Sequence, residues 1–164
     1  MNAMIGRTLE SIPVVPPNPA LPGSGWLASW AHRDFLELGP YDTAPRAVRG
    51  LIRERLPVWG LEHLVEAAEL VATELVTNSV AATCEFISDP RLPPVRVWLL
   101  GSATRVAIPV WDGVARAPVE READDYDESG RGLFLVRQFS SEWNFWFPLE
   151  PFSGKVTWAT IGQP

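Results

Sequence analysis

Two segments of the chain carry apolar residues at the three- and four-residue spacing that an amphipathic helix requires. The first is residues 44–56, in which arginines fill much of the remaining surface. Its apolar positions on one face are Val48, Leu51, Ile52 and Leu56. The second is residues 62–82, whose length and alanine content favour a long helix. Pro57 and Gly60 are expected to end the first helix before the second begins.

Short apolar runs bounded by turn residues predict strands elsewhere in the chain. The predicted strands are residues 35–38, 95–100, 105–111, 142–147 and 155–161. The turn sequence GSAT at 101–104 is expected to join the second and third strands as a hairpin. Pro109 has no N–H to donate to a ladder, so it predicts a bulge or an unpaired edge in the third strand. Residues 132–140 are predicted to form a short third helix.

This order of elements predicts an α+β fold. We expect a two-layer sandwich in which helices pack on one face of a mostly antiparallel, mixed sheet. Residues 1–25 are rich in proline and lack periodicity, which predicts a flexible N-terminal arm. Residues 26–164 are then expected to form a single domain, since 164 residues suit one hydrophobic core.

Charge and composition narrow the function classes. The net charge of −6 and the lack of a Lys/Arg cluster argue against direct nucleic-acid binding, which depends on neutralising phosphates. Cys84 is the single cysteine, so no disulfide can form within the chain. We find no signal-peptide core and no apolar run of about 18 residues, so we expect a cytoplasmic protein that does not enter a membrane.

Glu74 and Asn78 stand one helical turn apart in the otherwise apolar stretch LVATELVTNSV. Both fall on the arc that is expected to face the sheet, together with Val71 and Leu75. Burying an unpaired carboxylate is unfavourable by several kcal/mol, so each side chain requires a partner, a cavity or an ion. The two side chains either border a cavity or lie at the rim of the core, and the helix alone leaves both interpretations open.

Three further segments have the same two interpretations. Asp112 and Gly113 follow a predicted strand, where a ligand could reach the carboxylate or where the pair forms an ordinary turn. Gly130 and Gly132 bracket the start of a predicted helix, whose free N–H groups suit an anion or serve a tight turn. Thr157, after Gly154, places a hydroxyl in the last strand, where threonine is also common for structural reasons.

The order of these motifs over residues 34–161 resembles the ATP-binding domain of the GHKL (Bergerat-fold) superfamily. ELVTNSV, SGRGLFLV and GKVTWA look most like the small anti-sigma-factor serine/threonine kinases of actinobacteria. The resemblance implies ATP and Mg²⁺ as ligands, with an anti-sigma-factor antagonist, a sigma factor, or both as protein partners. It also implies a homodimer formed through the edge of the first strand, here residues 35–38.

The resemblance assigns a role to each motif. Asn78 would hold the Mg²⁺ that accompanies the phosphates, and Glu74 would act as the general base. Asp112, with Gly113, would accept a hydrogen bond from the adenine amino group, and Thr157 would support that contact. The last motif would hold the phosphates: Gly130, Arg131, Gly132 and Leu133.

Two features keep a different function open. The segment after Asp112 reads Gly-Val-Ala-Arg, without the two later glycines that the family carries there. An acidic loop at residues 122–128 lies next to the expected phosphate site and would repel phosphates unless it faces away. The alternatives to a kinase are a non-catalytic interaction module with a degenerate nucleotide pocket and an ATPase in which the same base activates water.

Overall fold

The computed structural model describes residues 12–19, 30–118 and 132–163. Its elements are β1 (His32–Leu38), α2 (Ala44–Val58), the 3-10 turn η2 (Glu62–Leu64), α3 (Val65–Phe86), β2 (Val95–Gly101), β3 (Arg105–Asp112), α4 (Gly132–Phe139), β4 (Glu142–Trp146) and β5 (Lys155–Gly162). Each predicted helix and strand is present, with ends that differ from the prediction by a few residues. The largest difference is at the second helix, where a 3-10 turn precedes α3.

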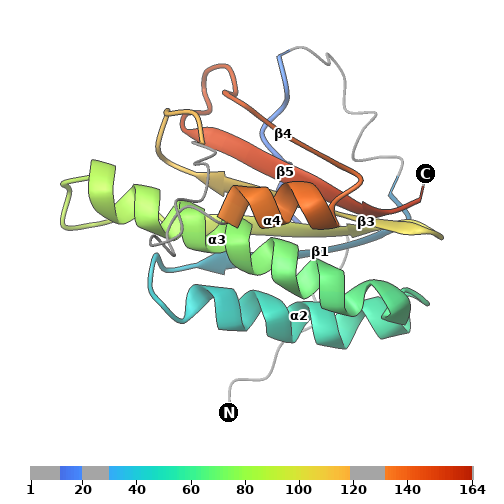
Figure 1. The fold of residues 1–164 in the computed structure, drawn as a ribbon. Coiled ribbons are helices and arrows are strands. Elements are labelled where there is room, and N and C mark those ends of the chain that lie inside the picture. The colour runs from blue at the N-terminus through green and yellow to red at the C-terminus, as the bar shows by residue number, and fades with distance from the viewer. Residues whose placement is uncertain (1–11, 20–29, 119–131, 164) are drawn as a thin grey trace.

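The strands form one sheet in the order β1-β2-β3-β5-β4. The helices cover one face of this sheet (Figure 1), which confirms the predicted α+β sandwich. Every strand pair described is antiparallel, so the expectation of a mixed sheet is wrong for this part of the chain. Connections between antiparallel strands therefore produce the whole strand order of this sheet. β1 lies at an edge of the sheet, as predicted for residues 35–38.

Pro109 lies in the central strand β3. The pairing of β2 with β3 covers residues 96–97 and 100–101 and is interrupted between them, opposite Pro109. The register is the same on both sides of the gap, so no extra residue is inserted. Pro109 therefore removes a ladder contact on one side without the predicted bulge, while its pairing with Trp158 of β5 continues.

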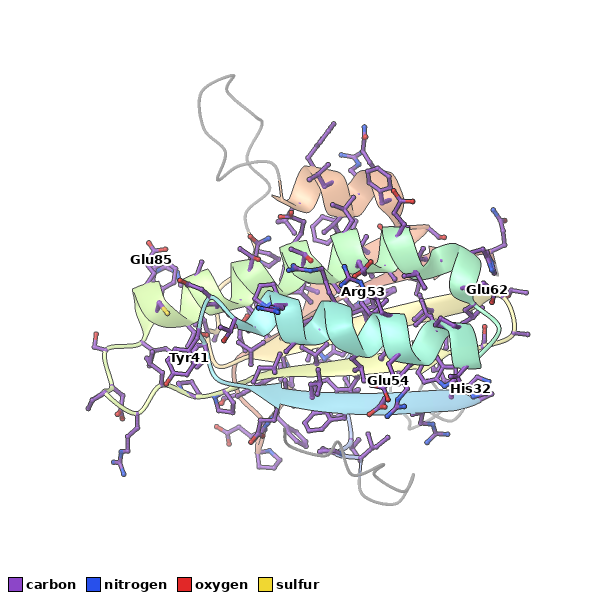
Figure 2. All side chains as sticks on the ribbon, turned by 90° about the horizontal axis from the view of Figure 1, so that it is seen from below. His32, Tyr41, Arg53, Glu54, Glu62 and Glu85 are labelled. Carbon is purple, nitrogen blue, oxygen red and sulfur yellow. The ribbon has the colours of Figure 1, made fainter. Side chains whose placement is uncertain are left out.

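The main core lies between the helices and the sheet. α2 contributes the apolar face predicted from its sequence, and α3 contributes Val71, Leu75 and Val76. Charged side chains of α2 contact both α3 and β1. Arg53 lies 2.5 Å from a side-chain oxygen of Glu69 on α3, and Arg55 pairs with Asp34 of β1. Figure 2 shows Arg53 between the two helices and Glu54 towards β1. Within the described ranges, no helix is long and apolar enough to cross a membrane.

Residues 12–19 pack on the opposite face of the sheet. Val15 is 3% exposed and joins a second apolar cluster that includes Trp30, Trp98 and Trp146. The indole N–H of Trp98 donates to the carbonyl of Pro13 at 2.7 Å, and that of Trp146 donates to the carbonyl of Pro16 at 3.0 Å. The described part of the expected flexible arm is thus ordered, because its carbonyls and Val15 meet tryptophans from the sheet. The boundary at residue 25 lies outside the described residues and stays a prediction.

Candidate functional site

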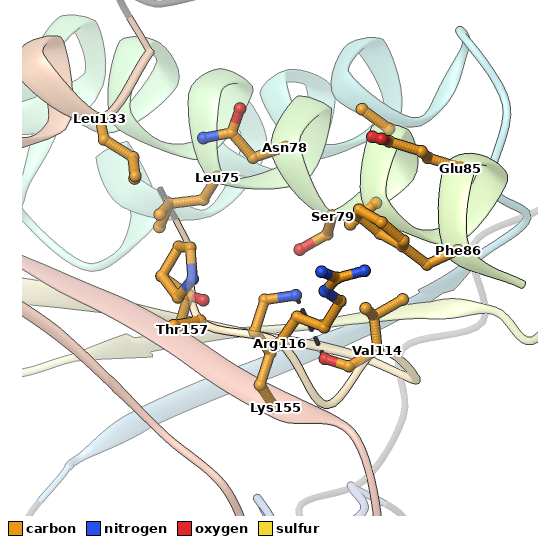
Figure 3. A pocket seen from close by; sticks show the side chains of 14 residues that line it. Leu75, Asn78, Ser79, Glu85, Phe86, Val114, Arg116, Leu133, Lys155 and Thr157 are labelled. Carbon is orange, nitrogen blue, oxygen red and sulfur yellow. Dashed lines mark hydrogen bonds between the residues drawn. The ribbon is translucent and has the colours of Figure 1, made fainter. Parts of the chain in front are cut away.

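A cavity of about 300 Å³ lies between the middle of α3, the start of α4, the beginning of β5 and the segment after β3. Figure 3 shows Asn78 and Ser79 of α3 facing Lys155 and Thr157 of β5 across this space. Apolar side chains such as Leu75 and Leu133 complete its inner wall. At the far end of α3, the guanidinium carbon of Arg116 lies 4.1 Å from the centre of the Phe86 ring.

Glu74, Asn78 and Gly132 meet where α3 faces the first residue of α4. A β-carbon placed on Gly132 would lie 2.7 Å from Oε2 of Glu74 and 3.4 Å from the amide atoms of Asn78. A larger residue at this position would push the Glu74 carboxylate away from the α4 backbone. Glu74 and Asn78 are half-buried at the border of the buried face of α3. They do not point into the core against the sheet, because Val71, Leu75 and Ser79 occupy that face.

Burial also changes the acidity of Glu74. Desolvation raises the pKa of its carboxyl above the ordinary value for glutamate. A carboxylate with a raised pKa is a stronger proton acceptor than an exposed one. The side chain therefore suits the role of a general base, and it lies one turn from an amide that could accompany a metal-bound phosphate.

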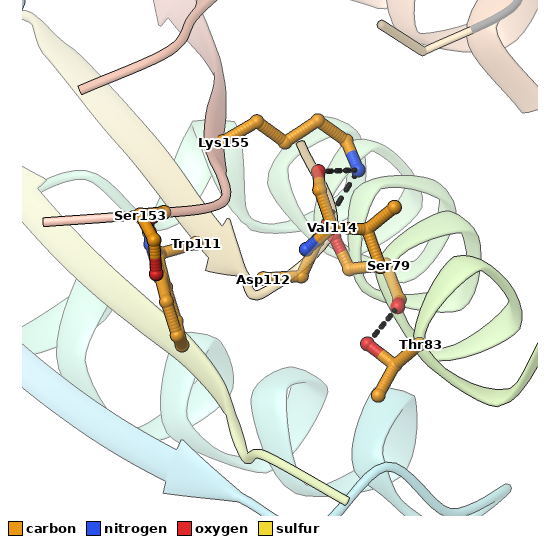
Figure 4. Close-up of polar contacts among 7 residues, drawn as sticks. All are labelled: Ser79, Thr83, Trp111, Asp112, Val114, Ser153 and Lys155. Atoms are coloured by element: carbon orange, nitrogen blue, oxygen red, sulfur yellow. Dashed lines mark hydrogen bonds and ion pairs between the residues drawn. The ribbon is translucent and has the colours of Figure 1, made fainter. Parts of the chain in front are cut away.

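The floor of the cavity is a buried ion pair between Asp112 and Lys155. The ammonium nitrogen lies 2.8 Å from Oδ1 of Asp112 and 3.4 Å from the carbonyl oxygen of Val114 (Figure 4). The same Oδ1 accepts the backbone N–H of Val114 at 2.9 Å. Asp112 is fully buried, and Lys155 lines the cavity in its place. Oδ2 of Asp112 is buried without a hydrogen-bond partner among the described residues.

The register of the sheet creates this pair. Asp112 ends β3 and stands directly opposite Lys155, which begins β5. Gly154 makes the close approach possible: its φ is +76°, and an added β-carbon would lie 2.0 Å from the carbonyl oxygen of Asp112. No other residue type fits such a position without moving the backbone. Glycine is thus required beside the ion pair for a steric reason.

The structure places the other predicted site residues as follows. Asn78, Leu133 and Thr157 line the cavity. Thr157 pairs with Val110 in the register, and the side chain that bonds to Asp112 is that of Lys155. The supporting role of Thr157 at a bound base stays a prediction. Gly113 faces Pro93, 3.1 Å from where its β-carbon would be, so it packs against the loop before β2. Gly130, Arg131 and the acidic loop at 122–128 lie outside the described residues.

Sequence reasoning missed Lys155, although two signals pointed to it. It is the only lysine in the sequence, beside thirteen arginines, and it stands between Gly154 and an apolar run. A lysine at the start of a buried strand requires a partner for its charge. The partner is 43 residues away in sequence, so its identity followed only from the strand register. Sequence reasoning likewise missed Ser79, which is 2% exposed and lines the cavity.

Comparison with known proteins supports the fold. No known family model and no curated protein matches the sequence. A crystal structure of the RsbU and RsbW domains of Rv1364c from Mycobacterium tuberculosis is similar to this chain, with a TM-score of 0.57 and 19% sequence identity. The match covers 82% of this chain and 34% of that one, so this chain spans about a third of its length. The likeness confirms the predicted α+β fold with helices on one face of the sheet, and at this identity it shows the fold alone.

Proposed function

We propose that this protein binds ATP with Mg²⁺ in the cavity between α3 and β5 and transfers the γ-phosphoryl group to a serine or threonine of a small protein. The observation that carries the proposal is the meeting of Glu74, Asn78 and Gly132 beside the cavity, which Asn78 itself lines. A proton acceptor, an amide and a helix N-terminus there provide what a phosphate and its metal need.

The residues present fit a nucleotide. The N-terminus of α4, which begins at Gly132, would face the phosphates, and Asn78 would provide an amide oxygen to the accompanying Mg²⁺. When bound, that ion would neutralise phosphate charge. The base would then lie towards Lys155, behind which Asp112 holds a buried carboxylate oxygen without a hydrogen-bond partner among the described residues. Gly130 and Arg131 are proposed to extend the phosphate site.

Glu74 is proposed to accept the proton of the attacking hydroxyl. The hydroxyl oxygen then forms a bond to the γ-phosphorus, the bond from that phosphorus to the bridging oxygen breaks, and ADP leaves. The raised pKa of Glu74 supports this role, because the carboxylate gains more by taking a proton than an exposed one would. Substrate water in place of a hydroxyl would give ATP hydrolysis by the same residues.

The partners are proposed from the motif resemblance and the fold. An anti-sigma-factor antagonist would supply the accepting serine or threonine, and a sigma factor would be a second partner, making the protein a cytoplasmic regulator of transcription. The outer edge of β1, which pairs with no further strand among the described residues, is the proposed surface for a homodimer, since an edge strand offers unpaired backbone groups.

A second function is a non-catalytic interaction module. The pairing of Lys155 with Asp112 favours it, because the ammonium occupies one oxygen of the carboxylate that would otherwise be open to a ligand. On this alternative the fold is retained for protein contacts, and the cavity binds nucleotide weakly or not at all. The module also explains the absence of the two later glycines after Asp112.

A thermal-shift titration with Mg²⁺ and ATP separates these functions. A ligand at 100 times its Kd adds about 2.7 kcal/mol to the free energy of unfolding, which is a readily measured rise in Tm. Asn78→Ala should remove the part of the shift that depends on Mg²⁺. Asn144→Ala is the matched control, since Asn144 is exposed on β4. No shift for the parent protein at millimolar nucleotide would reject the proposal in favour of the module.

A further inference from the structure

Lys155 is the charged group that the cavity presents to a ligand at its floor, beside the hydroxyl of Thr157. Its side chain is 6% exposed and lines the cavity, whereas the Asp112 side chain behind it is 0% exposed. Figure 4 shows the ammonium joined to both Asp112 and Val114. A ligand that enters this space therefore meets a lysine nitrogen before it meets the carboxylate.

The hydrogen-bonding capacity of this nitrogen is not used up. An ammonium group has three N–H donors and no acceptor. One donor is directed to Oδ1 of Asp112 and a second, more weakly, to the carbonyl of Val114 at 3.4 Å. Among the described residues the third has no acceptor, so it can donate to an acceptor that a ligand supplies. Removing the ammonium from its place would leave a buried carboxylate without its counter-charge, which is strongly unfavourable.

The exposed donor of Lys155 affects which purine base of a nucleotide can lie against the floor of the cavity. The 6-amino group of adenine is a donor and would face the N–H groups of Lys155, leaving both unpaired. The 6-keto group of hypoxanthine or guanine is an acceptor and takes a charge-assisted hydrogen bond from the ammonium. Adenine instead places its amino donor at the position where the 6-keto purines place an acceptor, so it cannot accept from the ammonium there.

We propose that Lys155 makes this pocket select 6-keto purine nucleotides over 6-amino purine nucleotides. The inference rests on the proposed nucleotide function and replaces its base, while the phosphate end of the cavity keeps the same roles. Sites that hydrogen-bond a ligand group discriminate strongly against an analogue that cannot form the bond, because buried polar groups are then left unpaired.

Binding of inosine triphosphate and ATP to the full chain with Mg²⁺ tests this preference by titration calorimetry. The two nucleotides have the same ribose and phosphates and differ at position 6 and N1 of the base. We expect inosine triphosphate to bind at least about tenfold more tightly. Equal binding, or tighter binding of ATP, overturns the inference and leaves the nucleotide proposal standing. The variant Lys155→Thr is titrated in the same way. If neither nucleotide binds to the parent protein or to this variant, both the base preference and the proposed nucleotide function are overturned.

Variants connect the preference to Lys155. Lys155→Met keeps the length of the side chain and removes its donors, so the ratio of the two affinities should fall to within about threefold of one. Because this change leaves Asp112 unpaired, the double variant Lys155→Met/Asp112→Asn provides a floor without charge. A tenfold preference that persists in the double variant overturns the assignment to Lys155. A second outcome also overturns the assignment to Lys155. In that outcome ATP binds to the Lys155→Thr variant while the parent protein binds neither nucleotide, which would mean that Lys155 blocks the pocket.

A control variant tests whether loss of any cation would change the ratio. Arg96→Met removes an exposed cation on β2 that pairs with Glu37 at 2.9 Å. Arg96 does not line the cavity, so the ratio of the two affinities should equal that of the parent. A change in this ratio as large as that in Lys155→Met would overturn the assignment of the preference to a contact with Lys155.

Discussion

The ammonium nitrogen of Lys155 lies 2.8 Å from Oδ1 of Asp112, and the two side chains are 6% and 0% exposed. The two residues are direct partners across β3 and β5. Two charges withdrawn from water to this extent depend on each other, because neither could remain charged there alone without a large desolvation penalty. The contact is therefore expected to matter both for stability and for the proposed ligand binding.

Removal of one member of this pair should destabilise the protein. Lys155→Met is expected to lower the free energy of unfolding by about 3–5 kcal/mol, because it leaves a buried carboxylate uncompensated. Lys155→Met/Asp112→Asn should recover more than half of that loss, since no net charge remains buried. Urea unfolding followed by tryptophan fluorescence measures both. A loss below about 1 kcal/mol in the single variant would show that the carboxylate is not dependent on Lys155.

Glu74→Gln should separate catalysis from stability. Burial raises the pKa of Glu74, so the folded protein holds this proton more tightly than the unfolded chain. The contribution of Glu74 to stability is therefore fully present below the unfolded pKa and is lost as pH rises through the folded pKa. At neutral pH the glutamine variant should have a Tm about 1–3 °C above the parent, and this difference should disappear near pH 4.

The same variant should retain nucleotide binding and lose phosphoryl transfer. Glu66→Gln is the control for both measurements, because Glu66 is exposed on the first turn of α3. Its Tm and transfer rate should match those of the parent protein. Transfer by Glu74→Gln at the parent rate would remove the general-base assignment, and a Tm below that of the parent at neutral pH would contradict the desolvation argument.

Two glycine-to-alanine changes should have opposite effects. Gly154→Ala would place a β-carbon 2.0 Å from the Asp112 carbonyl oxygen at a φ of +76°, so a loss of more than about 3 kcal/mol is expected. Gly50→Ala meets nothing within 4 Å in the interior of α2 and should add about 0.5–1 kcal/mol through helix propensity. Chemical unfolding measures both. Equal effects at the two positions would show that the approach of β5 to Asp112 is not tight.

The segment before β1 should contribute to stability. Val15→Ala is expected to lower the free energy of unfolding by about 1–2.5 kcal/mol, because the side chain is 3% exposed against the sheet. Val14→Ala is the matched control: Val14 is 65% exposed, and its change should be within about 0.5 kcal/mol of zero. Thermal unfolding compares the two. Equal values for these neighbours would mean that residues 12–19 do not pack on the sheet in solution.

Local sequence patterns were sufficient to predict the helices and strands and the group of Glu74, Asn78 and Gly132 beside the cavity. Apolar spacing in α2 and α3 depends on residues within a few turns, so the helices could be predicted from sequence. Glu74 and Asn78 stood out because polar side chains one turn apart interrupt an apolar helix. Gly132 stood out because it opens the next helix, and the structure brings these three residues together.

The amino-acid sequence by itself determined the helices, the strands and the order in which the polar motifs occur, because these follow from short-range spacing and from the φ preferences of glycine and proline. Only the tertiary structure decided that Lys155 contacts Asp112, because that contact depends on the register of two strands far apart in sequence. It also decided that residues 12–19 lie on the sheet, since their carbonyls find indole donors from Trp98 and Trp146. Charge pairing and burial are properties of neighbours in space, which spacing along the chain does not specify.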